Sequence, residues 1–223
     1  MKKCCPDCKL VNFAAAAECA RCRRDLLEVS TFDIHERTPR KPSFAIVVVR
    51  RAAVCVFMIA FTLFGFYLSL IGSAEQLHVN EKASIKRSIE IIDDGGFRSE
   101  TFLLRYLTAY RATDNWLNAS VEKENAYAAA NFPFEILTIY PDCFNLTRDE
   151  VERAAILLHE AQHLKGADEK EAYAFVWKNR KRIGWTSDKY SGSVVWRNIR
   201  KQTREIAPEL FVCPENDFSD CTE

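Results

Sequence analysis

The longest uninterrupted apolar run of the chain is Ala52–Ile71. Its 20 residues carry no charged side chain, and Arg50 and Arg51 stand directly before it. A helix rises 1.5 Å per residue, so this run would be about 30 Å long, which matches the hydrocarbon thickness of a bilayer. The run is too long for a cleaved signal peptide, and it is apolar on every side, unlike an amphipathic core helix. We therefore predict a transmembrane segment at residues 44–72, with both arginines snorkelling to the interface.

The segment after this run is long enough to form one hydrophobic core. Its pattern of apolar positions and breakers predicts helices at Glu75–Ile92, Thr101–Arg111, Val121–Ala130, Thr147–Lys165, Asp168–Arg182 and Val194–Ile206. Only Phe134–Tyr140, which ends before Pro141, has the composition of a strand. We predict an α+β, mainly helical domain.

Composition divides the chain into four predicted segments. A cysteine-rich finger covers residues 1–24, and a basic, proline-containing linker covers 25–43. The transmembrane segment at 44–72 follows, and 73–223 form the soluble domain. The formal net charge of zero hides an asymmetry, because residues 1–51 hold 11 Lys and Arg against 6 Asp and Glu. The excess of positive charge therefore lies before the apolar run.

One predicted helix contains the sequence His159-Glu160-Ala161-Gln162-His163. Residues four apart share one face of a helix, so His159 and His163 can present two imidazoles to one metal ion. Glu160 lies one step round the helix, where it is free to accept a proton from a metal-bound water. Gly166 is expected to end the helix through a positive φ, after which a returning chain could complete the site.

This motif resembles that of the zincin metallopeptidases, over a stretch of about thirty residues that begins at Val151. The resemblance implies a zincin-like fold in which His159 and His163 are zinc ligands and Glu160 is the catalytic base. Both the metzincin and the gluzincin patterns of that class select Glu169 as the third ligand. Asp168 and Glu171 remain the alternatives for this ligand. No particular zincin family is assigned.

The resemblance also implies a mechanism, namely hydrolysis of a peptide bond by a zinc-activated water. The donor that stabilises the oxyanion is left open among Tyr173, Tyr190 and His78. Zincins carry a strand beside the active helix whose edge can pair with an extended substrate, and this role is expected for Phe134–Tyr140. The alternative is a plain buried strand.

The first residues of the chain contain two Cys-x-x-Cys pairs. Cys5 and Cys8 form the first pair and Cys19 and Cys22 the second, with Cys4 as an alternative to Cys5. Two such pairs can close a tetrahedral thiolate site, and the pattern resembles a small zinc ribbon. Four thiolates leave no open position, so this zinc is expected to be structural. We expect a cytoplasmic protein partner for the finger and no nucleic-acid partner.

Basic residues predict the orientation of the membrane segment. Five of them lie in the twenty residues before Ala52 and three in the twenty after Ile71. The positive-inside rule then places the N terminus in the cytoplasm and residues 73–223 outside it. Thiolate pairs suit the reducing side, whereas Cys143, Cys213 and Cys221 on the other side allow at most one bridge within the chain.

Together these features predict a single-pass, membrane-anchored zinc metallopeptidase that acts on a peptide or protein substrate. It would carry one catalytic and one structural zinc ion. The alternative is a catalytically inactive zincin-like scaffold or sensor in the membrane, whose cytoplasmic finger recruits a partner.

Overall fold

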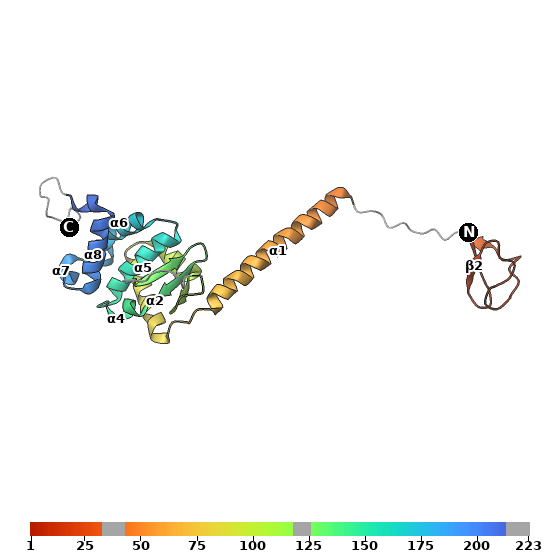
Figure 1. The fold of residues 1–223 in the computed structure, drawn as a ribbon, viewed down its shortest axis with the longest axis horizontal. Helices are drawn as coiled ribbons and strands as arrows, with labels where there is room; N and C mark the ends of the chain where they lie inside the picture. The colour runs from red at the N-terminus through yellow and green to blue at the C-terminus, as the bar shows by residue number, and fades with distance from the viewer. Residues whose placement is uncertain (33–42, 118–125, 213–223) are drawn as a thin grey trace. The chain divides into compact units, whose positions relative to one another are not determined.

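The structure is a computed structural model that describes residues 1–32, 43–117 and 126–212. The chain divides into two compact units, Met1–Val56 and Phe57–Glu223 (Figure 1). Each unit has its own buried core, as expected of a finger and a soluble domain that fold around different residues.

The finger is a three-stranded antiparallel sheet with the order β2-β1-β3. The strands are β1 (Lys2–Cys4), β2 (Val11–Phe13) and β3 (Thr31–Phe32). Strand β3 and the buried Leu26 lie beyond residue 24, the predicted end of the finger. They belong to the fold because β3 pairs with β1, and because Lys3 Nζ donates a hydrogen bond of 2.8 Å to the Leu26 carbonyl. Residues 33–42 of the predicted linker lie outside the described part of the chain.

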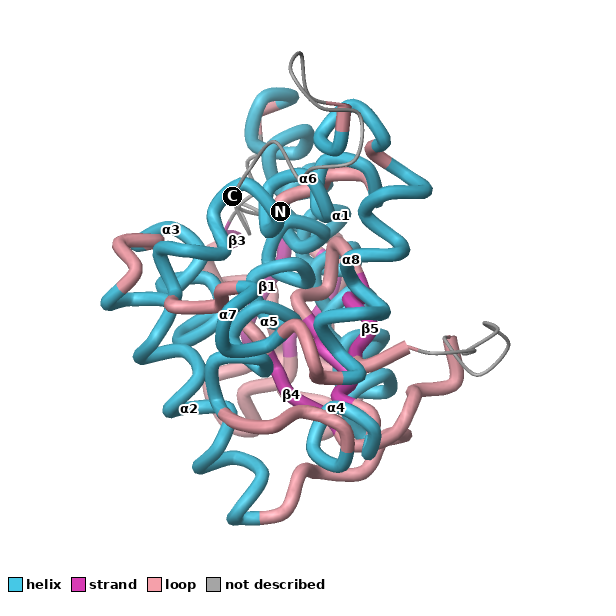
Figure 2. Tube along the Cα trace, turned by 90° about the vertical axis from the view of Figure 1, so that its left-hand side faces the viewer, coloured by secondary structure: helices cyan, strands magenta, loops and turns pink. Residues whose placement is uncertain are grey.

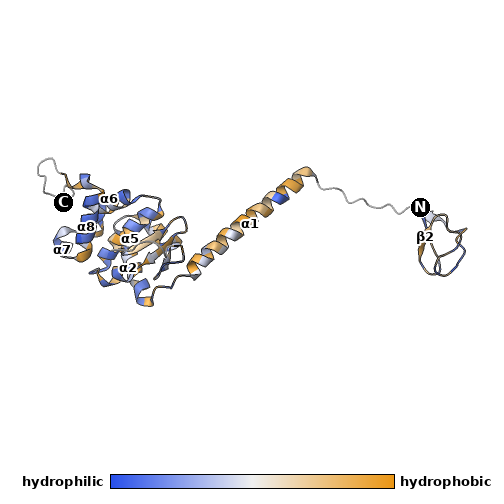
Figure 3. Ribbon diagram, viewed as in Figure 1, coloured by the Kyte–Doolittle hydropathy of each residue, from blue (hydrophilic) through white to orange (hydrophobic). Residues whose placement is uncertain are grey.

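Helix α1 (Phe44–Gly72) has 29 residues and is the one helix in the described ranges that is long and apolar enough to cross a membrane. It includes the apolar residues 44–49, so these extend the helix. Figure 3 shows hydrophobic colouring along most of α1, with a hydrophilic stretch near its start, where the sequence has Arg50 and Arg51. Leu70 is its single buried residue.

The soluble unit contains a small mixed sheet of three strands with the order β4-β6-β5. Strands β4 (Ala109–Arg111) and β6 (Ile136–Ile139) are parallel, whereas β5 (Ala128–Asn131) is antiparallel to β6. The predicted strand at Phe134–Tyr140 is confirmed, because it contains β6.

Two predicted helices are wrong, because the structure has strands where they were expected. Thr101–Arg111 begins as helix but ends in β4, and the described part of Val121–Ala130 enters β5. The alanine-rich β5 has a high intrinsic helix propensity, but pairing with β6 and packing against a helix override it.

The helices of the soluble unit are α2 (Val79–Asp94), α3 (Arg98–Phe102), the π-helix η1 (Leu103–Leu107), α4 (Pro141–Asn145), α5 (Glu150–Leu164), α6 (Glu169–Asn179), the 3-10 helix η2 (Arg180–Ile183), α7 (Ser187–Tyr190), α8 (Val194–Ile206) and the 3-10 helix η3 (Pro208–Phe211). They pack around α5, which contacts the sheet at β5; Figure 2 shows α2, α5 and α8 with the strands β4 and β5. The predicted bounds of α8 are confirmed.

Helix α5 is the centre of the soluble unit. It packs against α2, α6 and β5, and its residues Ala154, Leu157, Leu158 and Ala161 are fully buried. The small side chains of Ala154 and Ala161 let neighbouring elements approach closely, while Leu157 and Leu158 on the same face fill the core. A helix that is covered on nearly every side is held at a fixed position and rotation, which is what a site built on its surface requires.

The start of α5 is capped by Asp149. Its carboxylate accepts hydrogen bonds from the backbone N–H groups of Val151 and Glu152 and from the hydroxyl of Tyr190. The helix therefore begins after Asp149 and not at Thr147, where the sequence predicted its start. Thr147 instead donates its hydroxyl to the Cys143 carbonyl, which ties α4 to the chain before α5.

Replacing Asp149 by alanine should lower stability. The change leaves two N–H groups of the first turn without their acceptor and removes the partner of Tyr190, so we expect a loss of about 1–2 kcal/mol. This corresponds to a fall in Tm of roughly 2–8 °C, measured by circular dichroism on the full chain in detergent. The control is Glu90→Ala, at an exposed position on α2. An Asp149→Ala protein that melts with the wild type would show that the cap does not stabilise α5.

Candidate metal centre

Two imidazoles and one carboxylate meet where α5 ends and α6 begins. His159 and His163 lie one turn apart on α5, with their Nε2 atoms 3.0 Å apart. Gly166 turns the chain at φ +87°, as expected, and brings Glu169 back onto the first turn of α6. Its Oε2 atom lies 3.4 Å from Nε2 of His159 and 3.5 Å from Nε2 of His163.

These separations fit the chemistry of a tetrahedral metal. Ligand atoms bound at about 2.1 Å with tetrahedral angles lie about 3.4 Å from one another. All three ligand atoms lie within 4.8 Å of one another, so the group could hold one ion. The donor set of two histidine nitrogens and one carboxylate oxygen suits zinc and leaves a fourth position for water or substrate.

The two alternative third ligands have other partners. Asp168 caps α6 and accepts the backbone N–H of Glu171 at 2.8 Å, while Glu171 accepts the backbone N–H of Asp168. This reciprocal capping box holds the turn that presents Glu169. Among the described residues, Glu169 is the acid that groups with the two histidines.

The second ring nitrogen of His163 is also occupied. Its Nδ1 lies 3.0 Å from the Ala167 carbonyl, which favours a proton on Nδ1 and leaves Nε2 to bind a metal. In the metal-free protein the Glu169 carboxylate raises the pKa of His163 to about 9. Hydrogen bonds from His159 and His163 in turn lower the pKa of Glu169. Without a bound metal, protonated His163 and ionised Glu169 therefore form a charged pair at neutral pH.

Two buried acids on α5 have different surroundings. Glu152 accepts hydrogen bonds from the Arg148 backbone N–H and the Ser193 hydroxyl, which satisfy it within the core. Glu160 is only 6% exposed and lies in the wall of a cavity beside His159. Burial raises the pKa of Glu160, so this carboxyl group has a higher proton affinity than an exposed glutamate.

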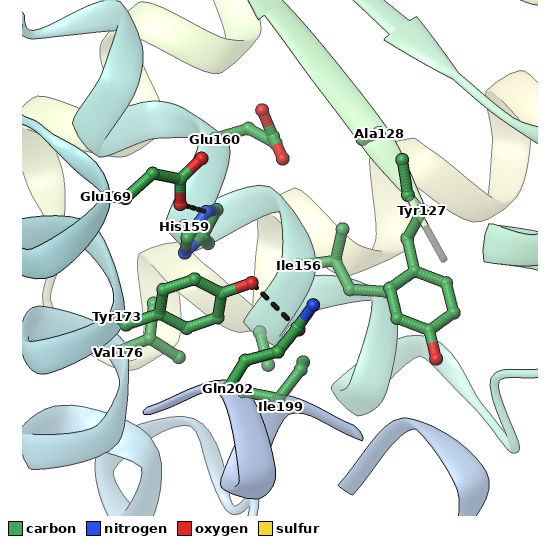
Figure 4. Close-up of a pocket in the computed structure, with 12 residues that line it drawn as sticks. Tyr127, Ala128, Ile156, His159, Glu160, Glu169, Tyr173, Val176, Ile199 and Gln202 are labelled. Carbon is green, nitrogen blue, oxygen red and sulfur yellow. Dashed lines mark hydrogen bonds and ion pairs between the residues drawn. The ribbon is translucent and has the colours of Figure 1, made fainter. Parts of the chain in front are cut away.

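The cavity has a volume of about 190 Å³ and opens beside the group formed by His159, His163 and Glu169, which we call the metal-ligand group. Figure 4 shows Glu169 in contact with His159, with Glu160 and Tyr173 on opposite sides of that histidine in this view. The walls of the cavity come from β5 and the residues just before it, and from α5, α6 and α8. They include Ala126, Tyr127, Ala128, Ala155, Ile156, Val176, Ile199 and Gln202. The site therefore has an apolar wall on one side and ionisable groups on the other.

Of the three candidate oxyanion donors, only Tyr173 lines the cavity. Its ring centroid lies 4.4 Å from that of His159, and its hydroxyl donates to Gln202 at 2.8 Å. Tyr190 hydrogen-bonds to Asp149 at the other end of α5, and His78 lies at the start of α2.

A buried polar network of Glu100, Gln162 and Lys165 at the end of α5 was not predicted from the sequence. Glu100 of α3 accepts hydrogen bonds from Lys165 at 2.7 Å and from Gln162 at 3.3 Å. Burial opposes its ionisation, but these bonds and one from Ser99 lower the pKa of Glu100 to about 2. The network fixes the last turn of α5, which carries His163. Only the polar Gln162 inside an apolar helix signals it in the sequence.

The four predicted cysteines of the finger also come together. Cys5 Sγ lies 3.5 Å from Cys22 Sγ, and Cys8 Sγ lies 3.5 Å from Cys19 Sγ, so the group could hold an ion. Backbone N–H groups of Cys22 and Arg21 lower the pKa of Cys19 to about 6, which favours its thiolate form. The alternative ligand Cys4 is not in this group.

The disulfide expectations fall largely outside the described residues. Cys143 is a free, fully buried thiol on α4, and burial raises its pKa to about 12. Cys213 and Cys221 belong to the part of the chain that is not described.

Comparisons with protein-family models, curated proteins and solved structures return no match to this chain. The case for a zincin-like site therefore rests on the motif and on the geometry given above.

We expect the full chain to bind two metal equivalents, one at each group. His159→Ala should lose one equivalent, and Cys19→Ala should lose the other, because each change removes one ligand from one group. Metal content by inductively coupled plasma mass spectrometry measures this directly. His78→Ala, which removes the histidine at the start of α2, should keep both equivalents. Two equivalents in His159→Ala would exclude the proposed ligand set.

Metal affinity at the His159 group should depend on pH. His163 is protonated below about pH 9 in the metal-free protein, so a metal ion must displace that proton. With the finger already loaded, affinity for the second equivalent should rise about tenfold for each pH unit from about pH 7 to about pH 8.5. Zinc titrations with a competing chelator measure it. A zinc affinity that stays constant between about pH 7 and pH 8.5 would contradict a protonated His163 paired with Glu169.

Proposed function

We propose that this protein is a membrane-anchored zinc metallopeptidase. The observation that carries the proposal is the convergence of His159, His163 and Glu169 beside a cavity whose wall holds the buried Glu160. Structural ion pairs also bring histidines and acids together. A structural ion pair, however, requires neither an adjacent cavity nor two imidazole nitrogens directed at one point. It also does not require a second, buried acid such as Glu160 beside the histidines.

The residues have distinct roles in this proposal. His159, His163 and Glu169 hold the zinc ion, which when bound would lower the pKa of water and polarise a carbonyl. Glu160 accepts a proton from the attacking water and passes it to the leaving amine. Its raised pKa suits both steps, because a general base works best when its pKa approaches the working pH.

The substrate strand is assigned to β5 rather than to the segment Phe134–Tyr140. Strand β6 in that segment pairs with β4 on one side and β5 on the other, so it has no free edge. Strand β5 lies at the edge of the sheet, and Tyr127 and Ala128 line the cavity. An extended peptide that adds to this edge would pass the metal ligands with its backbone held by hydrogen bonds.

The cavity favours a substrate side chain that is apolar. Ile156, Val176 and Ile199 form one part of its wall, and burying a side chain against them would stabilise the complex by roughly 1.5–3 kcal/mol. The Tyr173 hydroxyl is the donor nearest to His159 among the three candidates, and we assign it to the oxyanion. It must exchange its bond to Gln202 for the substrate.

The anchor and the finger complete the proposal. Helix α1 spans the bilayer with the finger in the cytoplasm and the peptidase domain outside, as the distribution of basic residues indicates. Cys5, Cys8, Cys19 and Cys22 hold a structural zinc, and the finger binds a cytoplasmic protein.

Glu160→Gln should abolish peptide hydrolysis and keep both metal equivalents. The amide has the shape of the acid but cannot accept the proton, so we expect a loss of about 10² to 10⁴ in kcat. Cleavage of a peptide library by the full chain in detergent, read by mass spectrometry, measures it. Glu90→Gln is the matched control for an exposed helix acid.

Two outcomes would contradict the proposal. An active Glu160→Gln protein would remove Glu160 from the mechanism. A wild-type protein that binds metal at His159 but cleaves no peptide would support the inactive scaffold or sensor instead.

A further inference from the structure

The C-terminal end of α1 is packed against the soluble unit. The Phe66 ring lies 5.3 Å from the rings of both Trp116 and Phe134, and Leu70 is fully buried. These contacts lie within the unit Phe57–Glu223. The helix therefore does not leave the domain through a flexible tether.

Hydrogen bonds fasten the same region. Trp116 Nε1 donates to the Ser69 hydroxyl at 3.1 Å, and Arg111 Nε donates to the Ile71 carbonyl at 3.1 Å. The Ala112 N–H then donates to the Glu75 carbonyl at 2.8 Å. Because these bonds join the helix end to β4 and the loop after it, the end of α1 and this loop move as one body.

The position of these contacts along α1 indicates how deep the packed groups would lie in a bilayer that α1 spans. No charged residue lies between Arg51 and Glu75, and the apolar run ends at Ile71. Phe66 is five residues before that end, which at 1.5 Å per residue is about 7.5 Å along the helix. Groups that pack against Phe66 would therefore lie within about 7.5 Å of the end of the apolar run, close to the interface, if α1 spans a bilayer.

Three large apolar side chains on the segments that carry Trp116 and Phe134 are exposed in the described part of the chain. Trp116 is 50% exposed, Leu117 44% and Phe132 60%. Leu117 is presented by a turn in which its N–H donates to the side chain of Asn115 at 3.0 Å. Phe132 lies on the turn from β5 to β6, two residues before Phe134.

We propose that Trp116, Leu117 and Phe132 form an apolar rim that inserts into the interface of the bilayer that α1 spans. The proposal rests on the membrane anchor of the proposed function. Its occupant is lipid because Trp116 of the rim packs on Phe66 of the apolar α1, and because tryptophan and phenylalanine are suited to the interfacial region. The domain is thus held on the membrane surface in one orientation.

This orientation constrains the substrate. Strand β5 runs from Ala128 at the cavity to Asn131, and Phe132 of the rim follows directly. At about 3.3 Å per residue, the cavity lies roughly 13 Å along the chain from the rim. The site would therefore act on polypeptide segments close to the bilayer, such as those that flank the membrane spans of other proteins.

Tryptophan fluorescence of the full chain in vesicles tests the rim. Trp177, Trp185 and Trp196 are at most 2% exposed, so Trp116 is the one tryptophan that a quencher can readily reach. The probe is phosphatidylcholine brominated on its acyl chains near the headgroup. Wild type should be quenched, and Trp116→Phe should lose that quenching down to the level of the three core tryptophans.

Three further variants in the Trp116→Phe background complete the test. Phe132→Trp should restore quenching by the brominated lipid, and Phe64→Trp, at an exposed position on α1, should do so as well. Val194→Trp, at the start of α8, should be quenched only by acrylamide in the water. Wild-type metal content verifies that each variant is folded.

The outcomes separate the two proposals. Quenching at Phe64→Trp without quenching at Trp116 and Phe132→Trp would overturn the rim and leave the membrane anchor standing. No quenching at Phe64→Trp would overturn both. Quenching of Val194→Trp by the brominated lipid to the same degree as Trp116 would also overturn the rim. The lipid would then contact α8 as much as the rim.

Discussion

The structure depends on the burial of α5 in a fixed rotation. Its alanines and leucines are covered by α2, α6 and β5, so a turn of the helix about its axis would expose core residues to water. This packing directs His159 and His163 to one side and leaves Glu160 beside them in the cavity wall. The geometry of the metal-ligand group thus comes from the apolar core rather than from the polar residues themselves.

The second constraint is the short return of the chain after α5. Gly166 adopts a conformation that is unfavourable for other residues, and the capping box of Asp168 and Glu171 starts α6 three residues later. Glu169 therefore reaches the histidines from the next helix with little freedom. The Glu100 network with Gln162 and Lys165 holds the other side of the same helix end. Together they restrain the ligand group on both sides of α5.

Local features of this site could be predicted from the sequence, because they depend on spacing along one helix and its turn. Helical periodicity brings His159 and His163 together, and Glu169 follows only six residues after His163, across the turn at Gly166. The same is true of the two Cys-x-x-Cys pairs. The sheet could not be predicted in this way, since the alanine-rich β5 becomes a strand only through its pairing with β6. Glu100 and the cavity walls also come from distant parts of the chain, which no local pattern reveals.

The central claim is that one zinc ion is held by His159, His163 and Glu169. Anomalous diffraction at the zinc edge, from crystals of the full chain loaded with zinc, tests it most directly. We expect an anomalous peak about 2.1 Å from Nε2 of both histidines and from a carboxylate oxygen of Glu169. Density for zinc at the finger alone, with these three side chains bound to no ion, would contradict it.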